Sequence, residues 1–181
     1  GVGRLAGLLD GALGLLDLYR HAAHPLHLFV SQSLRTLARD AFGDWLLESL
    51  ASRQIDGSAL VIDVRLPDAL IHTVTLQQFC TRMHAAGVRF CLSQFEPGDE
   101  ANALMAQLPL AYVRMAARFS NSHTNQQTRD ELRAAIDLAH RAGLRIIGQQ
   151  IEDPQAAAAM WIGGIDFIQG NMVQSAGSEL N

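Results

Sequence analysis

The chain contains no lysine, because all 14 of its basic residues are arginine. This absence excludes a Schiff-base lysine and every other form of lysine-dependent catalysis. The net charge of −4 comes without any cluster of basic residues, which argues against a nucleic-acid surface. A small anionic ligand would still need only one or two well-placed arginines.

Long apolar runs are missing as well. No run is long enough for a membrane-spanning helix, which needs roughly 18 or more apolar residues. The first stretch carries Asp10 and Asp17 without a basic leader, so the sequence predicts no signal peptide. We therefore expect a cytoplasmic protein. Because the chain begins at Gly1 and not at Met, we also expect it to be a segment of a longer, multidomain protein.

Cysteine is scarce, and its two positions carry no motif. Cys80 and Cys91 fall in apolar stretches and lack the spacing of a metal or redox site. We expect both thiols to be reduced and buried in the core. With 49% hydrophobic residues, a chain of 181 residues can bury a sizeable core, and its length is that of one domain. Residues 1–181 are therefore predicted to form a single domain.

Short apolar runs alternate with helical patterns along the whole chain. The predicted strands are residues 26–30, 59–64, 88–92, 110–115, 144–148 and 166–168. The predicted helices are residues 5–19, 34–52, 76–86, 101–107, 128–143 and the segment after Asp153 and Pro154. This alternation predicts an α/β fold with parallel strands, an open sheet or an incomplete or modified TIM-type (β/α) barrel of about six strand-helix units.

Several residues predict where these elements begin and end. The polar turn Ser31-Gln32-Ser33 precedes the helix that runs to about residue 52, and Pro67 is expected to break the second strand. Thr128 and Glu131 have the spacing of a capping box at the start of the helix that Gly143 ends.

Polar residues interrupt the apolar pattern where the predicted strands end. In the last third of the chain these are Gln149, Gln150, Glu152 and Gln169. The carboxyl ends of parallel strands meet at one edge of a sheet, and α/β folds bind their ligands there. We therefore expect the functional site at this edge.

Six of these polar breaks have a recognisable order. They read FVSQS, LVIDVRL, CLSQFEPG, YVRMAARF, IIGQQIED and DFIQG. This series resembles the EAL domain of cyclic di-GMP phosphodiesterases, whose corresponding motifs are VNLS, LEITE, LDDFGTG, YIKID, AEGVET and QGY. The resemblance covers nearly the whole chain but lacks the first strand, which carries the Glu-Ala-Leu signature. The terminal WIGGIDFIQGNMVQ is similar to FimX-like regulators, whose EAL domains bind cyclic di-GMP without hydrolysing it.

The resemblance implies a hydrolytic site that this chain has largely lost. Phosphodiester cleavage in the family needs divalent metals held by carboxylates and an amide. The metal-binding Asn of the family corresponds to Ser31, its paired aspartates to Ser93 and Gln94, and further acidic residues to Ala116 and Gln149. Neutral amides and hydroxyls cannot supply the charge that holds Mg²⁺ or Mn²⁺. We therefore expect a pseudoenzyme without metal or cofactor.

A few polar groups remain as candidates for ligand binding. They are Gln94, Arg114, Glu152 and Gln169. Arg114 corresponds to the Lys of YIKID, and its guanidinium could pair with a phosphate or, equally, with Glu152 or Asp63 in a buried ion pair. Glu152 could instead serve the positive end of the following helix, and Gln169 could satisfy backbone at a strand end. Gln94 could contact ligand or simply fill a former metal site with a neutral group.

Two functions follow as hypotheses. The first is a catalytically inactive EAL-like regulatory domain in cyclic di-GMP signalling that acts as a protein-interaction module. A protein partner or a second copy would cover the exposed sheet edges or helices that a short barrel leaves. The alternative is a non-catalytic cyclic di-GMP receptor of the FimX type that uses Arg114, Glu152 and Gln169. An active phosphodiesterase is the weakest reading.

Overall fold

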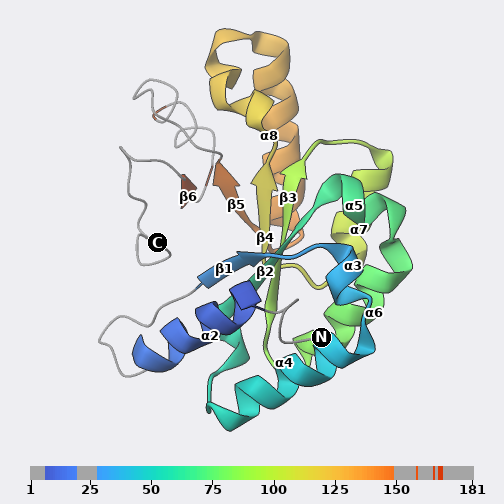
Figure 1. Cartoon of the computed structure of the whole chain (residues 1–181). Helices are drawn as coiled ribbons and strands as arrows, with labels where there is room; N and C mark the ends of the chain where they lie inside the picture. The colour runs from blue at the N-terminus through green and yellow to red at the C-terminus, as the bar shows by residue number, and fades with distance from the viewer. Residues whose placement is uncertain (1–6, 20–27, 149–157, 159–164, 166, 169–181) are drawn as a thin grey trace. The chain divides into compact units, whose positions relative to one another are not determined.

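The computed structural model describes residues 7–19, 28–148, 158, 165 and 167–168 (Figure 1). Within them, parallel strands alternate with helices, and the predicted α/β class is confirmed. The chain divides into two compact units. Of the described residues, the first unit holds 7–19, 28–64 and 68–90, and the second holds 65–67, 91–148, 158, 165 and 167–168.

The first unit is built on a parallel strand pair. Strands β1 (Leu28–Ser31) and β2 (Leu60–Arg65) run side by side, and their register pairs Ser31 with Asp63. The helices of this part of the chain are α2 (Gly7–Tyr19), α3 (Leu34–Leu37), α4 (Asp40–Ser52), α5 (Leu66–Ile71) and α6 (Thr73–His84). Helix α4 packs against α3 and α6, and its contact with α6 includes buried aromatic rings. The Phe79 ring lies 6.0 Å from that of Phe42 and 6.0 Å from that of Phe90.

The single helix predicted after β1 is two helices in the structure, so that prediction was wrong. Ser33 caps α3 as expected, because its hydroxyl accepts the backbone N–H of Thr36 at 3.3 Å. The chain then leaves the helix at Arg39, whose ψ of 121° is extended, and α4 begins at the next residue. Apolar periodicity continues across the break, since Leu37 and Phe42 are both buried, and it therefore hides the turn between them.

The sequence predicted only that Pro67 would end the second strand, but in the structure this residue lies inside the following helix. It lies at the second position of α5, directly after Leu66. Proline is tolerated in the first turn of a helix because a backbone N–H there has no partner within the helix. The chain therefore turns from β2 into α5 without an intervening loop.

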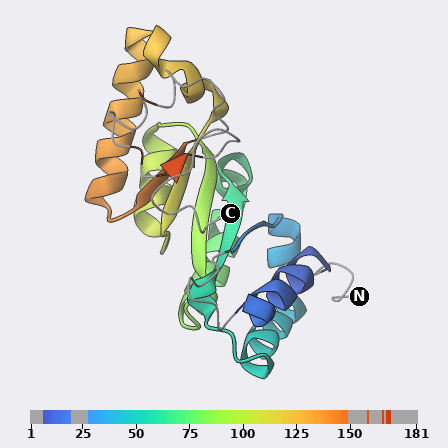
Figure 2. The same ribbon diagram turned by 90° about the vertical axis from the view of Figure 1, so that its left-hand side faces the viewer.

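In the second unit, the strands pair in chain order. Strand β3 (Arg89–Phe95) enters this unit at Cys91 and pairs with β4 (Tyr112–Met115), which pairs with β5 (Arg145–Gly148), which pairs with β6 (Phe167–Ile168). All these pairings are parallel. The connecting segments include α7 (Asp99–Gln107), the 3₁₀ segment η2 (Ala117–Thr124) and α8 (Gln126–Arg141). Helix α8 packs against η2 and β5 (Figure 2). Sequential parallel strands joined by helices are the arrangement of a (β/α) barrel.

The N-terminus of α8 is capped differently from the prediction. The cap is Asn125, whose side chain accepts the backbone N–H of Thr128 at 3.1 Å. Thr128 therefore lies inside the first turn and is not the cap, and the predicted capping box was wrong. Asparagine is a better N-cap than threonine, because its side-chain oxygen readily accepts a backbone N–H of the first turn. The end was correctly placed, because Gly143 adopts a φ of +80° just after the helix.

Both cysteines are free and buried, as predicted. Burial raises the pKa of the Cys80 thiol to about 12. In the described part of the chain, no helix has the length and apolar character that crossing a membrane requires.

Candidate functional site

The carboxyl ends of β3 and β4 place polar side chains close together in the second unit. The register pairs Cys91 with Tyr112. The register then pairs Leu92 with Val113 and Phe95 with Met115, so Ser93 lies opposite Arg114. Ser93 is buried and Arg114 is half-buried. The ends of these two strands therefore carry a neutral hydroxyl and a guanidinium.

Gln94 has an unusual backbone conformation. Its φ is +52°, in the left-handed region that residues with a side chain rarely adopt. The register of β3 against β4 shifts between Leu92 and Phe95, which makes the segment a β-bulge. A bulge redirects the side chain at its centre, and such bulges are common beside functional sites. The exposed side chain of Gln94 therefore points in a different direction from that of a residue in a regular strand.

The side chain of Gln94 is bound to Arg65, the last residue of β2. Its Oε1 accepts the Nε–H of Arg65 at 3.3 Å and an Nη2–H at 3.1 Å. Both residues belong to the second unit. Because the amide is neutral, this partner leaves the charge of the exposed guanidinium uncompensated.

Arg65 was absent from the candidates that the sequence provided. It stands at the end of the apolar run LVIDVRL, at the position where polar breaks were otherwise used as the signal. The charge at the end of a buried strand could therefore have identified Arg65 as a candidate site residue. What the sequence could not provide was its contact with Gln94, since the two are far apart in the chain and the bulge cannot be read from apolar periodicity.

A divalent metal, which the resemblance to EAL phosphodiesterases implies, does not fit these residues. The oxygen of Gln94 that would have to face a metal already accepts two N–H groups from a cation. A guanidinium at that oxygen would repel a metal ion. At the end of β4, Ala116 offers only a methyl group. In the described residues, no group of three or more His, Cys, Asp or Glu side chains lies close enough to hold a metal.

In the first unit, the structure brings Ser31 and Asp63 together as register partners. The backbone N–H of Gln32 donates to the carbonyl of Asp63 at 3.0 Å, which fixes the end of β1 against β2. The Asp63 side chain is buried, and Ser31 is exposed. The structure therefore places a hydroxyl and a buried carboxylate at the adjacent ends of these two strands.

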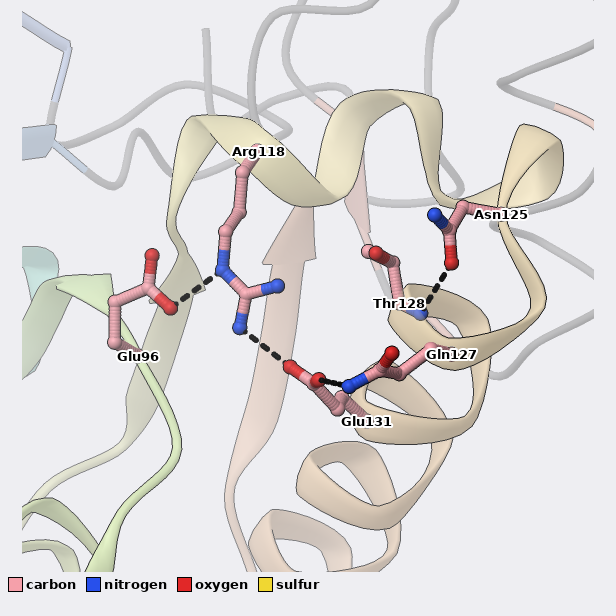
Figure 3. A network of polar contacts seen from close by, with 6 residues as sticks. All are labelled: Glu96, Arg118, Asn125, Gln127, Thr128 and Glu131. Carbon is pink, nitrogen blue, oxygen red and sulfur yellow. Dashed lines mark hydrogen bonds and ion pairs between the residues drawn. The ribbon is translucent and has the colours of Figure 1, made fainter.

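Arg118 ties the loop after β3 to the start of α8 (Figure 3). Its Nε–H donates to Glu96 Oε2 at 2.6 Å, and an Nη2–H donates to Glu131 Oε2 at 2.7 Å. Gln127 Nε2 lies 3.5 Å from the second oxygen of Glu131. The guanidinium carbon also lies 4.0 Å from the centre of the Phe119 ring. The segment that follows Gln94 is thereby fastened to the helix.

The electrostatics of this network involve both burial and the two carboxylates. Burial alone would lower the pKa of Arg118, but its hydrogen bonds and attraction to Glu131 and Glu96 raise that pKa above its ordinary value. All three side chains are partly exposed, at 42% for Arg118, 47% for Glu96 and 39% for Glu131. Water screens such pairs, so each contributes about 0.2–1 kcal/mol to folding. Within the second unit, the carboxylate of Glu96 is therefore paired with Arg118.

Two of the predicted ligand-binding residues, Glu152 and Gln169, lie outside the described residues, as does Gln149. Their roles remain predictions. Of the four predicted ligand-binding residues, the structure therefore places Gln94 and Arg114, and it adds Arg65.

Comparison with known proteins gives a consistent family assignment. The model of the EAL domain family matches residues 8–176. A 76.5 kDa protein from Thiocystis violacea is 24% identical over 160 residues, which are 88% of this chain and 22% of that protein. The probable cyclic di-GMP phosphodiesterase PdeN of Escherichia coli is 26% identical over 126 residues, which are 69% of this chain and 24% of PdeN. The chain thus spans about a quarter of the length of the curated relatives it matches.

Solved structures show the same fold. The Xanthomonas citri FimX EAL domain in complex with cyclic di-GMP superimposes with a TM-score of 0.87 at 20% identity, over 93% of this chain and 67% of that one. The PaMucR phosphodiesterase in its cyclic di-GMP complex gives a TM-score of 0.82 at 19% identity, over 93% and 74% of the two chains. These likenesses establish the TIM-barrel-like fold of EAL domains for this chain.

Proposed function

The chain belongs to the EAL-domain family, and from this premise we propose that it acts in cyclic di-GMP signalling by binding the dinucleotide without hydrolysing it. The family contains proteins named as phosphodiesterases, such as PdeN and PaMucR, so membership alone does not decide between cleavage and binding. The side chains at the strand ends distinguish cleavage from binding.

One observation carries the proposal: the guanidinium of Arg65 occupies the oxygen of Gln94. The resemblance places Gln94 at one of the paired aspartates that hold metal in active relatives. A carboxylate there would attract a divalent ion, whereas an amide already bound to a cation does not. Ser93 and Ala116 stand at two further positions of this kind and add no negative charge. These three positions therefore offer no carboxylate to hold a metal ion that would polarise a phosphoryl group or generate a hydroxide.

Two arginine side chains of the second unit are suited to binding an anion. Arg65 and Arg114 both lie in the second unit, on β2 and β4. Cyclic di-GMP carries two phosphodiester charges, and guanidinium groups bind phosphate oxygens through paired hydrogen bonds. The similarity to a FimX EAL domain solved with cyclic di-GMP supports the same ligand for this chain.

Isothermal titration of the purified chain with cyclic di-GMP tests the proposal. Circular dichroism of the same sample first establishes that the protein is folded. We expect saturable binding with a Kd in the micromolar range or below, and we expect it without added Mg²⁺ or Mn²⁺. A folded sample that releases no heat and retains no ligand in equilibrium dialysis would contradict the proposal.

A second candidate function is a protein-interaction module, which one observation favours. Ile71 and Val74 are 74% and 66% exposed where α5 meets α6. Contiguous exposed apolar patches mark protein–protein interaction sites, and these two residues lie three positions apart where the two helices meet. If the chain fails to bind cyclic di-GMP, this candidate predicts that replacing both residues by serine abolishes association with a partner protein or a second copy.

We also propose that residues 1–181 form one degenerate EAL-like domain of a longer, multidomain protein. The support is the length of the curated relatives, of which the chain matches 22% and 24%. Cyclic di-GMP binding by this domain would then regulate another part of that protein.

A further inference from the structure

We propose that Arg65 is a phosphate-binding residue, positioned by Gln94, whose guanidinium takes the place of a metal ion as the positive charge facing a phosphodiester of the ligand. This inference rests on the proposed function and assigns a residue that the comparison with EAL motifs did not suggest. Three features of the second unit support it: the remaining donors of Arg65, the backbone of Gln94 and the pairing of the nearby acid.

The first feature is the set of donors that Arg65 keeps. A guanidinium has five N–H groups, and the two bonds to Gln94 use one on Nε and one on Nη2. Gln94 lies on the edge formed by Nε and Nη2, and the second edge, formed by Nη1 and Nη2, can also pair with two oxygens of a phosphate or carboxylate. Gln94 therefore holds Arg65 from one side and leaves this second edge for an anion. The side chain is exposed, so a ligand can reach it.

The second feature is the strained backbone that provides the contact. Gln94 adopts its φ of +52° within the bulge of β3. Glycine would take this conformation without strain, so the cost of a glutamine here requires a compensating role. Strain of this kind is concentrated at ligand sites, where it helps to preorganise side chains. The role we infer is to hold the carboxamide oxygen against Arg65.

The third feature is that the nearby acid is already neutralised. Glu96 follows Gln94 by two residues in the chain. Its carboxylate accepts the Nε–H of Arg118 at 2.6 Å, and Arg118 is held in turn by Glu131. The only hydrogen-bond partner of Arg65 in the described part of the unit is the neutral amide of Gln94. Its positive charge remains available to an anionic ligand.

The test compares variants of the chain by titration with cyclic di-GMP. We expect Arg65→Ala to weaken binding by about tenfold to a hundredfold, as expected for the loss of charge-assisted hydrogen bonds. Arg65→Lys should recover part of the loss, because it restores the charge without the planar fork. The matched control is Arg89→Ala, which removes an exposed arginine from the opposite, amino end of β3 and should leave affinity unchanged.

Gln94→Gly separates a positioning role from a structural one. Glycine relieves the strain at φ +52°, so thermal stability should stay the same or rise. Affinity should nevertheless fall by about threefold to tenfold, because Arg65 loses the oxygen that positions it. A merely structural contact would show the reverse, a lower melting temperature with unchanged affinity, and that result would overturn the inference.

The outcomes for the proposed function and for this inference are distinguishable. If the folded wild-type chain does not bind cyclic di-GMP, both are overturned. If it binds, and Arg65→Ala binds equally well, only the role of Arg65 is overturned. Competition with the linear dinucleotide and with inorganic phosphate adds a further arm. If Arg65 contacts a phosphodiester, excess linear dinucleotide should displace cyclic di-GMP from the wild type more effectively than inorganic phosphate does. In Arg65→Ala, the two competitors should differ less in how much cyclic di-GMP they displace.

Discussion

Replacing Arg118 by methionine should lower both the stability of the fold and the affinity for the ligand. Methionine keeps most of the side-chain length and the contact with Phe119, so the change removes mainly the two ion pairs. With exposures near 40%, each pair is worth about 0.2–1 kcal/mol, and the total loss in the free energy of unfolding should be about 1 kcal/mol. For a domain of this size that corresponds to a fall in Tm of roughly 2–4 °C.

The effect on binding has a separate cause. Without Arg118, the carboxylate of Glu96 loses its partner and can compete for Arg65, so affinity for cyclic di-GMP should fall by about threefold or more. The double variant Arg118→Met with Glu96→Gln removes this competing charge. It should regain affinity while remaining as unstable as the single variant, which chemical denaturation and titration of the two proteins would measure. Equal losses of affinity in the single and double variants would refute the reasoning.

Three further predictions concern the fold. Gly57→Ala should destabilise the first unit by about 3 kcal/mol or more, because the added Cβ would lie 2.1 Å from the backbone oxygen of Ala86, and urea unfolding would measure it. Asn125→Ala should cost about 1 kcal/mol in the same assay, through loss of the cap on Thr128, whereas Asn125→Asp should cost little. Cys80 should resist thiol reagents at neutral pH in the folded chain and react after unfolding. Because its pKa is raised from 9.0 to about 12, the stability it contributes is present below pH 9 and is lost as the pH rises toward 12.

The order of strands and helices could be predicted from the sequence because each element carries its own local signal. Buried strands such as β2 read as apolar runs, and Gly143 marked the end of α8 with the left-handed conformation that glycine favours. Capping was less well determined. Thr128 has the spacing of a capping box with Glu131, but the residue that caps α8 is Asn125, which directly follows η2.

The candidate site was only partly accessible from the sequence. Arg114 and Gln94 could be named because polar residues at strand ends stand out against an apolar pattern. The contact of Arg65 with Gln94 depends on a β-bulge, which has no local signature when its left-handed residue is glutamine instead of glycine. The pairing of Arg118 with Glu96 and Glu131 likewise joins residues that are separated in the chain and meet only through tertiary packing.

The most direct test of binding without cleavage is a single incubation. The folded chain is held with excess cyclic di-GMP and Mn²⁺, and the nucleotide, both protein-bound and free, is then analysed by chromatography. We predict that ligand is retained by the wild type and recovered intact as the cyclic dinucleotide, with less retained by Arg65→Ala. Accumulation of linear dinucleotide in proportion to the amount of protein would contradict binding without cleavage.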